Sequence, residues 1–167
     1  PNGWQRDKAH QLLLWQKDLS TVPMLERLAT SSARAATRVQ ALGALEGLDA
    51  LTPQVVEEAL RDSHPGVREN ALRLAEARLT SSVLATALMR VNDPSSKVRL
   101  QLAFTLGEWK ENAAGEALGH LAVANLDEPF LAAAVLSSAL PHRRHVVDAV
   151  AAAGGRAMEI FAEPLIQ

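Results

Sequence analysis

Residues 62–79, DSHPGVRENALRLAEARL, contain the pattern that decides the fold. Asp62 is of a residue type that caps helix N-termini, and Pro65 suits the first helical turn, where a missing N–H costs nothing. Apolar residues then recur at helical spacing and charged residues lie off this stripe: Val67, Ala71, Leu74 and Ala75 against Arg68, Glu69, Arg73 and Glu76. The stretch therefore predicts an amphipathic helix with one face available for packing.

The same pattern returns along the chain with a period of 30–32 residues. An arginine holds the repeated position until a leucine replaces it: Arg6, Arg38, Arg68, Arg99 and then Leu131. Six residues before the later positions stand residues that favour helix N-caps: Ser32, Asp62, Asp93 and Asn125. Because two kinds of position share one period, the sequence predicts a helical repeat.

Each period also contains a start signal for a second helix. These signals are Thr21 with Pro23, Thr52 with Pro53, Ser81 with Ser82, Asn112, and the basic turn 141–144. No strand-like alternation is present, so we expect a single all-α domain over residues 1–167, a right-handed α-α superhelix (solenoid) of about five helix pairs. The expected units are 2–31, 32–61, 62–92, 93–124 and 125–153, with a partial unit or cap at 154–167.

Composition limits the classes of function. Hydrophobic residues make up 48% of the chain and charged residues 22%, as in a globular protein, and a formal net charge of −2 disfavours binding to nucleic acid or acidic lipid. The chain contains no cysteine, so it has neither a disulfide nor a thiolate ligand. The longest apolar run, 130–140, is too short to span a membrane, and we expect a buried helix there.

Residues 62–71 and 93–99 resemble the D-P-x-V-R-x-x-A pattern of HEAT repeats, including those related to the phycobilisome lyase family. More narrowly, residues 2–7, 12–13, 42–48 and 64–73 look like the armadillo-like repeat segment of large exported planctomycete and verrucomicrobial dehydrogenase–cytochrome c proteins. That likeness implies a periplasmic or exported bacterial protein, with this segment cut from a longer chain. Because no Cys-x-x-Cys-His occurs, no haem would attach within it, and we expect no cofactor.

The repeated arginine has two interpretations. In the first, Arg38, Arg68 and Arg99 form a structural ladder and donate to the caps of adjacent repeats, with Asp62 and Asp93 as acceptors. In the second, the arginines form a basic stripe for phosphate or a carboxylate partner. The structural ladder is favoured, because the arginine and its acidic cap follow the same period.

The other polar and aromatic candidates offer no evident chemistry, and we expect no catalytic site. His142 and His145 make an incomplete metal set, interpreted as a solvated turn. The single histidines His10, His64 and His120 are interpreted as surface or cap residues. The adjacent carboxylates Glu57 and Glu58 are interpreted as a solvated face. We expect Trp4, Trp15 and Trp109 to lie in the core.

The leading function is therefore a non-catalytic protein-interaction or spacer module, whose partner is another protein or a neighbouring domain. The second helices of a solenoid normally line its binding surface, and their polar residues are Gln54, Glu57, Glu58, Arg61, Thr86, Arg90, Glu116 and His120. Nucleic-acid binding is the alternative, and a lyase or isomerase acting on a bilin chromophore is implied only by the family resemblance. We also expect the apolar C-terminal end to be covered, by a following domain or by residues 156–166 through Met158, Ile160, Phe161 and Leu165.

Overall fold

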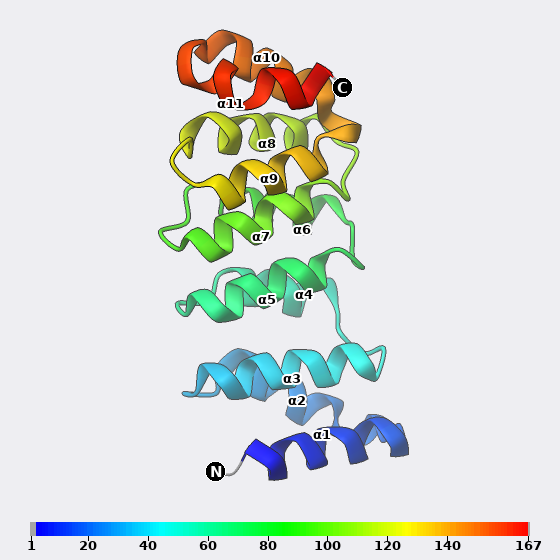
Figure 1. Ribbon diagram of the computed structural model, residues 1–167. Helices are drawn as coiled ribbons and strands as arrows, with labels where there is room; N and C mark the ends of the chain where they lie inside the picture. The colour runs from blue at the N-terminus through cyan, green and yellow to red at the C-terminus, as the bar shows by residue number, and fades with distance from the viewer. Residues whose placement is uncertain (1–2, 167) are drawn as a thin grey trace.

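The computed structural model describes residues 3–166, with the side chains of Arg6, Leu14 and Ile166 outside the description. Over these residues the chain forms eleven α-helices and two short 3-10 helices and contains no strand (Figure 1). The all-α prediction is therefore confirmed. In chain order the elements are α1 (Gly3–Gln16), η1 (Leu19–Thr21), α2 (Val22–Ser31), α3 (Ala35–Gly47), α4 (Pro53–Leu60), α5 (Pro65–Ala75), α6 (Ser81–Leu88), α7 (Ser96–Leu106), α8 (Asn112–Ala124), α9 (Pro129–Ser138), η2 (Leu140–His142), α10 (Arg143–Ala153) and α11 (Gly155–Ile166).

The helices are stacked in two layers. The odd-numbered helices α1 to α11 each contact the next odd-numbered helix, and the even-numbered helices α2 to α10 do the same in the second layer. Across the layers, α2 packs on α3, α4 on α5 and α10 on α11. Figure 1 shows this succession from α1 at one end to α11 at the other. Each helix therefore meets mainly elements close to it in sequence.

Local sequence explains where the even-numbered helices begin. Thr52 and Thr80 are the N-caps of α4 and α6, and their hydroxyls accept from the N–H groups of Val55 and Val83. Pro53 occupies the first turn of α4, where it removes no helical hydrogen bond. The observed N-caps of α4 and α6 therefore lie within one residue of the start signals predicted from the sequence.

Helices α5 and α7 start later than the aspartates predicted to cap them, so the cap prediction is wrong. Their N-caps are His64 and Ser95. Asp62 and Asp93 lie two residues earlier, where Oδ1 accepts from the N–H of His64 at 2.7 Å and of Ser95 at 3.0 Å. Each aspartate therefore closes the turn before its helix. The other two predicted caps are displaced similarly: the N-caps are Arg34 instead of Ser32 and Glu128 instead of Asn125.

The core lies between the two layers and consists of fully buried aliphatic side chains, among them Leu42, Leu72, Leu102 and Leu118. Trp109 is buried with them, as predicted. The core prediction is wrong for Trp4 and Trp15, which are 65% and 71% exposed. The two lie on one face of α1 together with Lys8 and Gln11, which hydrogen-bond each other at 3.0 Å. That face combines two aromatic and two polar side chains and does not pack on the core.

The interpretation of His142 as part of a solvated turn is wrong. Its side chain is buried between helices, and its Nε2 donates to the carbonyl oxygen of Leu106 at 3.1 Å. A Cβ atom at Gly115 of α8 would lie 2.6 Å from Nδ1 of His145 and 2.9 Å from Nδ1 of His142. Helices α8 and α10 approach closely because α8 has no side chain at this position.

At the C-terminal end, α11 folds back onto α9 and α10. Ala157, Phe161 and Leu165 are buried in this contact, and the guanidinium of Arg143 donates to the carbonyl oxygen of Leu165. Met158 stays exposed. The expectation of a buried helix at 130–140 is wrong at both ends, because Phe130 is 79% exposed and Leu140 is 85% exposed.

Candidate functional site

The repeated arginines bind the turns of the following helix pair. Arg38 on α3 donates from Nε to Oδ2 of Asp62 at 2.6 Å and from Nη2 to Oδ1 at 2.7 Å. Its third nitrogen, Nη1, donates to the carbonyl oxygen of Ser32 at 2.6 Å. One planar guanidinium thus holds the turn before its own helix and the turn before α5.

Arg68 on α5 repeats this geometry one unit later. Nε and Nη2 donate to Oδ2 and Oδ1 of Asp93, both at 2.7 Å, and Nη1 donates to the carbonyl oxygens of Asp62 and Ser63 at 2.8 and 3.0 Å. Both side chains of this pair are buried, with the carboxylate of Asp93 fully shielded from solvent. The pair therefore lies inside the structure, where water cannot replace either partner.

The third arginine meets a different acceptor set. Arg99 on α7 donates from Nη1 to the carbonyl oxygen of Asp93 at 2.6 Å and from Nε to Oδ1 of Asn125 at 3.0 Å, and it pairs with Glu128. At the next position Leu131 is buried in the core. The first member, Arg6, lies outside the described side chains.

Two aspartates in these pairs have altered acidity. Burial by itself would raise the pKa of Asp62 and of Asp93, because it disfavours the charged carboxylate. The hydrogen bonds from Arg38 and Arg68 and from the backbone N–H groups of His64 and Ser95, together with the charge of the arginines, outweigh burial and hold each pKa below the ordinary aspartate value. Both carboxylates are therefore ionised at neutral pH.

Sequence reasoning missed a second set of contacts between neighbouring units, near the C-terminal ends of α3, α5 and α7. Arg78 donates from Nε to the carbonyl oxygen of Leu51 at 2.7 Å and forms an ion pair with Glu46 at 2.5 Å. Farther along, Oε1 of Glu76 accepts from the hydroxyl of Thr105 at 2.8 Å and from Gln101 at 3.1 Å. These residues do not share one register position, so periodicity alone does not reveal them.

The predicted partner-binding residues lie on α4, α6 and α8 and in the turns that follow α4 and α6. Gln54, Glu58, Arg61, Glu116 and His120 are exposed, and Glu57 and Arg90 are partly exposed. Thr86 is only 3% exposed, because its hydroxyl donates back to the carbonyl oxygen of Ser82 and accepts from Arg61, so it is not available to a partner.

Within this set the structure joins Arg61 to Glu57, with Nη2 3.7 Å from Oε2, and to Thr86. Two members contact residues outside it: Nε2 of His120 lies 3.1 Å from Oδ1 of Asn92, and Nη1 of Arg90 lies 3.8 Å from Oδ2 of Asp93. We call the accessible residues Gln54, Glu57, Glu58, Arg61, Arg90, Glu116 and His120 the second-helix surface.

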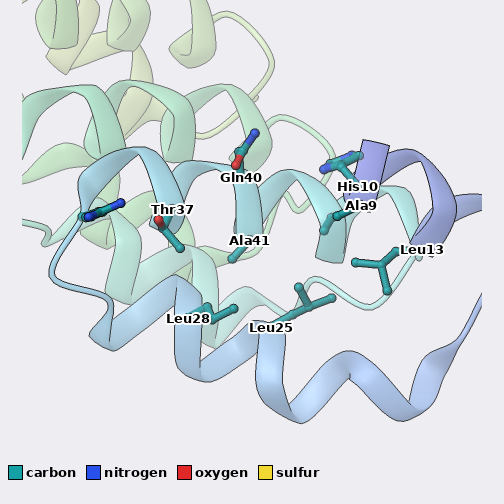
Figure 2. Close-up of a pocket in the computed structure, with 10 residues that line it drawn as sticks. Ala9, His10, Leu13, Leu25, Leu28, Thr37, Gln40 and Ala41 are labelled. Carbon is teal, nitrogen blue, oxygen red and sulfur yellow. The ribbon is translucent and has the colours of Figure 1, made fainter. Parts of the chain in front are cut away.

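A groove between α1, α2 and α3, with a cavity volume of about 270 Å³, has no counterpart in the sequence predictions. Its lining is mostly apolar and consists of Ala9, Leu13, Leu25, Leu28, Ala41 and Ala44, with His10, Arg34, Thr37 and Gln40 as the polar members. Figure 2 shows Leu25 and Leu28 of α2 below the groove, Thr37 and Ala41 of α3 above it, and Leu13 of α1 at one end. We call this the α1 groove.

No three His, Asp or Glu side chains in the described part of the chain come together as a possible metal-ligand set. None of the helices within residues 3–166 is both long and apolar enough to cross a bilayer. Comparison with known proteins found no matching family model, no matching curated protein and no matching solved structure.

Proposed function

We propose that the chain is a non-catalytic protein-interaction or spacer module, built as a right-handed superhelix of about five HEAT-like helix pairs. The observation that carries this proposal is the second-helix surface. Its polar side chains come from three successive helices of one layer and from the turns after the first two, and they remain accessible to solvent. Neighbouring packed helices lie 8–10 Å apart, so three of them present a surface roughly 20 Å long.

The ion pairs between units support this role, because they limit motion between neighbouring helix pairs. Arg38 and Arg68 each span two turns through charge-assisted hydrogen bonds, and Arg78 adds a contact elsewhere on the stack. A stack held in this way keeps its surface residues at fixed spacing. Fixed spacing lowers the entropy cost when a partner binds several of them at once.

Charge reversal on the second-helix surface tests the proposal. The test variant carries Glu57→Lys, Glu58→Lys and Glu116→Lys, and the matched control carries Glu108→Lys, Glu159→Lys and Glu163→Lys on exposed positions outside that surface. We expect affinity capture from the native cell extract to recover a protein with the parent and the control, and to lose it with the test variant. A protein held equally by both variants binds elsewhere and contradicts the assigned surface.

Nucleic-acid binding is the second candidate function, and the environment of the arginines argues against it. The guanidinium groups of Arg38, Arg68 and Arg99 are bound to acidic side chains or carbonyl oxygens, so they are not free to contact phosphate. Titration with a short DNA duplex at several salt concentrations distinguishes the two functions. We expect no binding at physiological salt, whereas affinity that falls steeply as salt rises would favour the nucleic-acid function.

A further inference from the structure

We propose that the α1 groove binds a single-chain aliphatic carboxylate, with the hydrocarbon chain along the apolar floor and the carboxylate at Arg34. This inference goes beyond the proposed function, because the α1 groove shares no residue with the second-helix surface. The supporting features are the narrow apolar floor and the unpaired charge of Arg34 at one end of it.

The floor is a continuous apolar strip formed by three helices. On α3 the lining residues Arg34, Thr37, Ala41 and Ala44 recur at helical spacing and therefore lie in one row. A helix rises 1.5 Å per residue, so this row is about 15 Å long. Leu25 and Leu28 line the opposite side from α2. Such a narrow apolar strip matches an extended hydrocarbon chain.

A positive charge lies at one end of the row. Arg34 begins it at the N-terminus of α3, and within the described residues its guanidinium makes no ion pair and no hydrogen bond with the protein. Arginine stays protonated at any physiological pH. Farther along, about 9 Å from Arg34 and beside the middle of the row, Gln40 donates to Oδ1 of Asp7 at 3.3 Å. A carboxylate is therefore favoured at the Arg34 end.

The α1 groove suits a narrow occupant. A helix with side chains is about 10 Å across, so it would rest on the rim and place only a few side chains in the groove. One unbranched hydrocarbon chain can instead lie along the row of α3 residues that lines it.

The position of α1 gives such a chain a way in. Helix α1 contacts α3, and none of its described side chains is fully buried. Leu13 on α1 and Leu28 on α2 both line the α1 groove and are partly exposed. The hydrocarbon chain can therefore enter without disruption of the core between α3 and α5.

Isothermal titration calorimetry with dodecanoate, below its micelle concentration, tests the proposal. Dodecyltrimethylammonium, which has the same chain and the opposite charge, serves as the matched ligand. We expect the parent protein to bind dodecanoate and to bind the cationic ligand more weakly. Arg34→Glu should weaken dodecanoate binding by about tenfold or more, because it removes a charge-assisted hydrogen bond and adds repulsion. The same change should improve binding of the cation.

Two further pairs of variants locate the binding. Leu28→Glu should abolish dodecanoate binding, whereas Leu79→Glu, at a similarly exposed leucine outside the α1 groove, should leave it unchanged: the two side chains are 36% and 46% exposed. Arg27→Glu, on α2 but outside the lining, is the control for Arg34→Glu. If Leu28→Glu loses its helical circular dichroism signal, that variant has unfolded, and the comparison of Arg34→Glu with Arg27→Glu decides the test.

Three outcomes would overturn the proposal. The parent protein does not bind dodecanoate, or it binds both ligands equally, or Arg34→Glu and Arg27→Glu bind dodecanoate alike. An acidic amphipathic peptide that binds the parent and is lost in Leu28→Glu, without dodecanoate binding, would assign the groove to a protein helix instead.

Discussion

Arg68 and Asp93 form a buried, two-point ion pair across 25 residues of sequence, with both N···O distances at 2.7 Å. Replacement of Asp93 by Ala would leave the guanidinium buried without its partner. We expect this change to lower the free energy of unfolding by about 3–5 kcal/mol, because it leaves a buried charge without its partner. Urea denaturation followed by circular dichroism measures it.

The exposed pair Arg144 and Asp148 provides the control, since its side chains are mostly in solvent and 3.7 Å apart. Asp148→Ala should leave the urea midpoint almost unchanged. An apolar double variant, Arg68→Met with Asp93→Leu, should recover only part of the stability lost in Asp93→Ala. It removes the unpaired guanidinium, but the N–H of Ser95 and the carbonyl oxygens of Asp62 and Ser63 still lose their partners. An Asp93→Ala protein with the parent's midpoint would contradict a stabilising role for the pair.

Acid should weaken the same contacts. The folded protein holds the pKa of Asp62 and of Asp93 below the ordinary aspartate value. A lowered folded pKa contributes stability that is fully present above the unfolded pKa, about 3.9, and is lost as pH falls through the folded value. We therefore expect the parent's free energy of unfolding to fall below about pH 4 more steeply than that of Asp62→Asn with Asp93→Asn. Parallel pH curves for the two proteins would refute this coupling.

The close approach of α8 and α10 gives a third prediction. A Cβ atom at Gly119 would lie 2.9 Å from Cβ of Ala149 and 3.0 Å from the carbonyl oxygen of His145. Because backbone atoms cannot move aside freely, Gly119→Ala should destabilise the fold by about 1–3 kcal/mol. At Gly43 in α3 the nearest atom to such a Cβ is 3.6 Å away, so Gly43→Ala should stabilise it by up to about 1 kcal/mol. If both variants changed the melting temperature in the same direction, this account of the packing would be contradicted.

Periodicity predicted the helices well and the polar details less well. The shared period of Arg68 and Asp93 indicated a contact between units, and the two residues do lie together. The N-caps were misplaced because an aspartate before a helix has two uses: its side chain can cap the helix or close the preceding turn. Asp62 closes the turn and binds Arg38 as well. Sequence alone does not distinguish these uses.

The errors at α1 have a simpler cause. The size and apolar character of Trp4 and Trp15 predict core positions, yet Lys8 and Gln11 share their face of the helix, and this pattern is visible in the sequence. The α1 groove was not predictable in the same way. It depends on how far α1 lies from α2 and α3, and no periodic pattern encodes that distance.

The contact of α11 with α9 and α10 gives the last stability prediction. Phe161 is 1% exposed within this contact, whereas Met158 on the same helix is 42% exposed. Phe161→Ala should therefore lower the free energy of unfolding by about 3–5 kcal/mol through lost burial and a cavity, and Met158→Ala should change it little. Equal melting temperatures for the two variants would show that α11 is not firmly packed.

Removal of α11 should have a larger effect than either substitution. Deletion after Gly155 takes away Phe161 and Leu165 and uncovers the apolar faces of α9 and α10 on which they pack. It also removes the carbonyl oxygen of Leu165, so the guanidinium of Arg143 loses its acceptor. Large exposed apolar patches drive association, so the truncated protein should elute from size-exclusion chromatography as oligomers at concentrations where the parent does not. Glu163→Lys, an exposed change on α11, is the control and should elute like the parent. A truncated protein with the parent's elution volume and melting temperature would mean that α11 is not needed to cover this end of the stack.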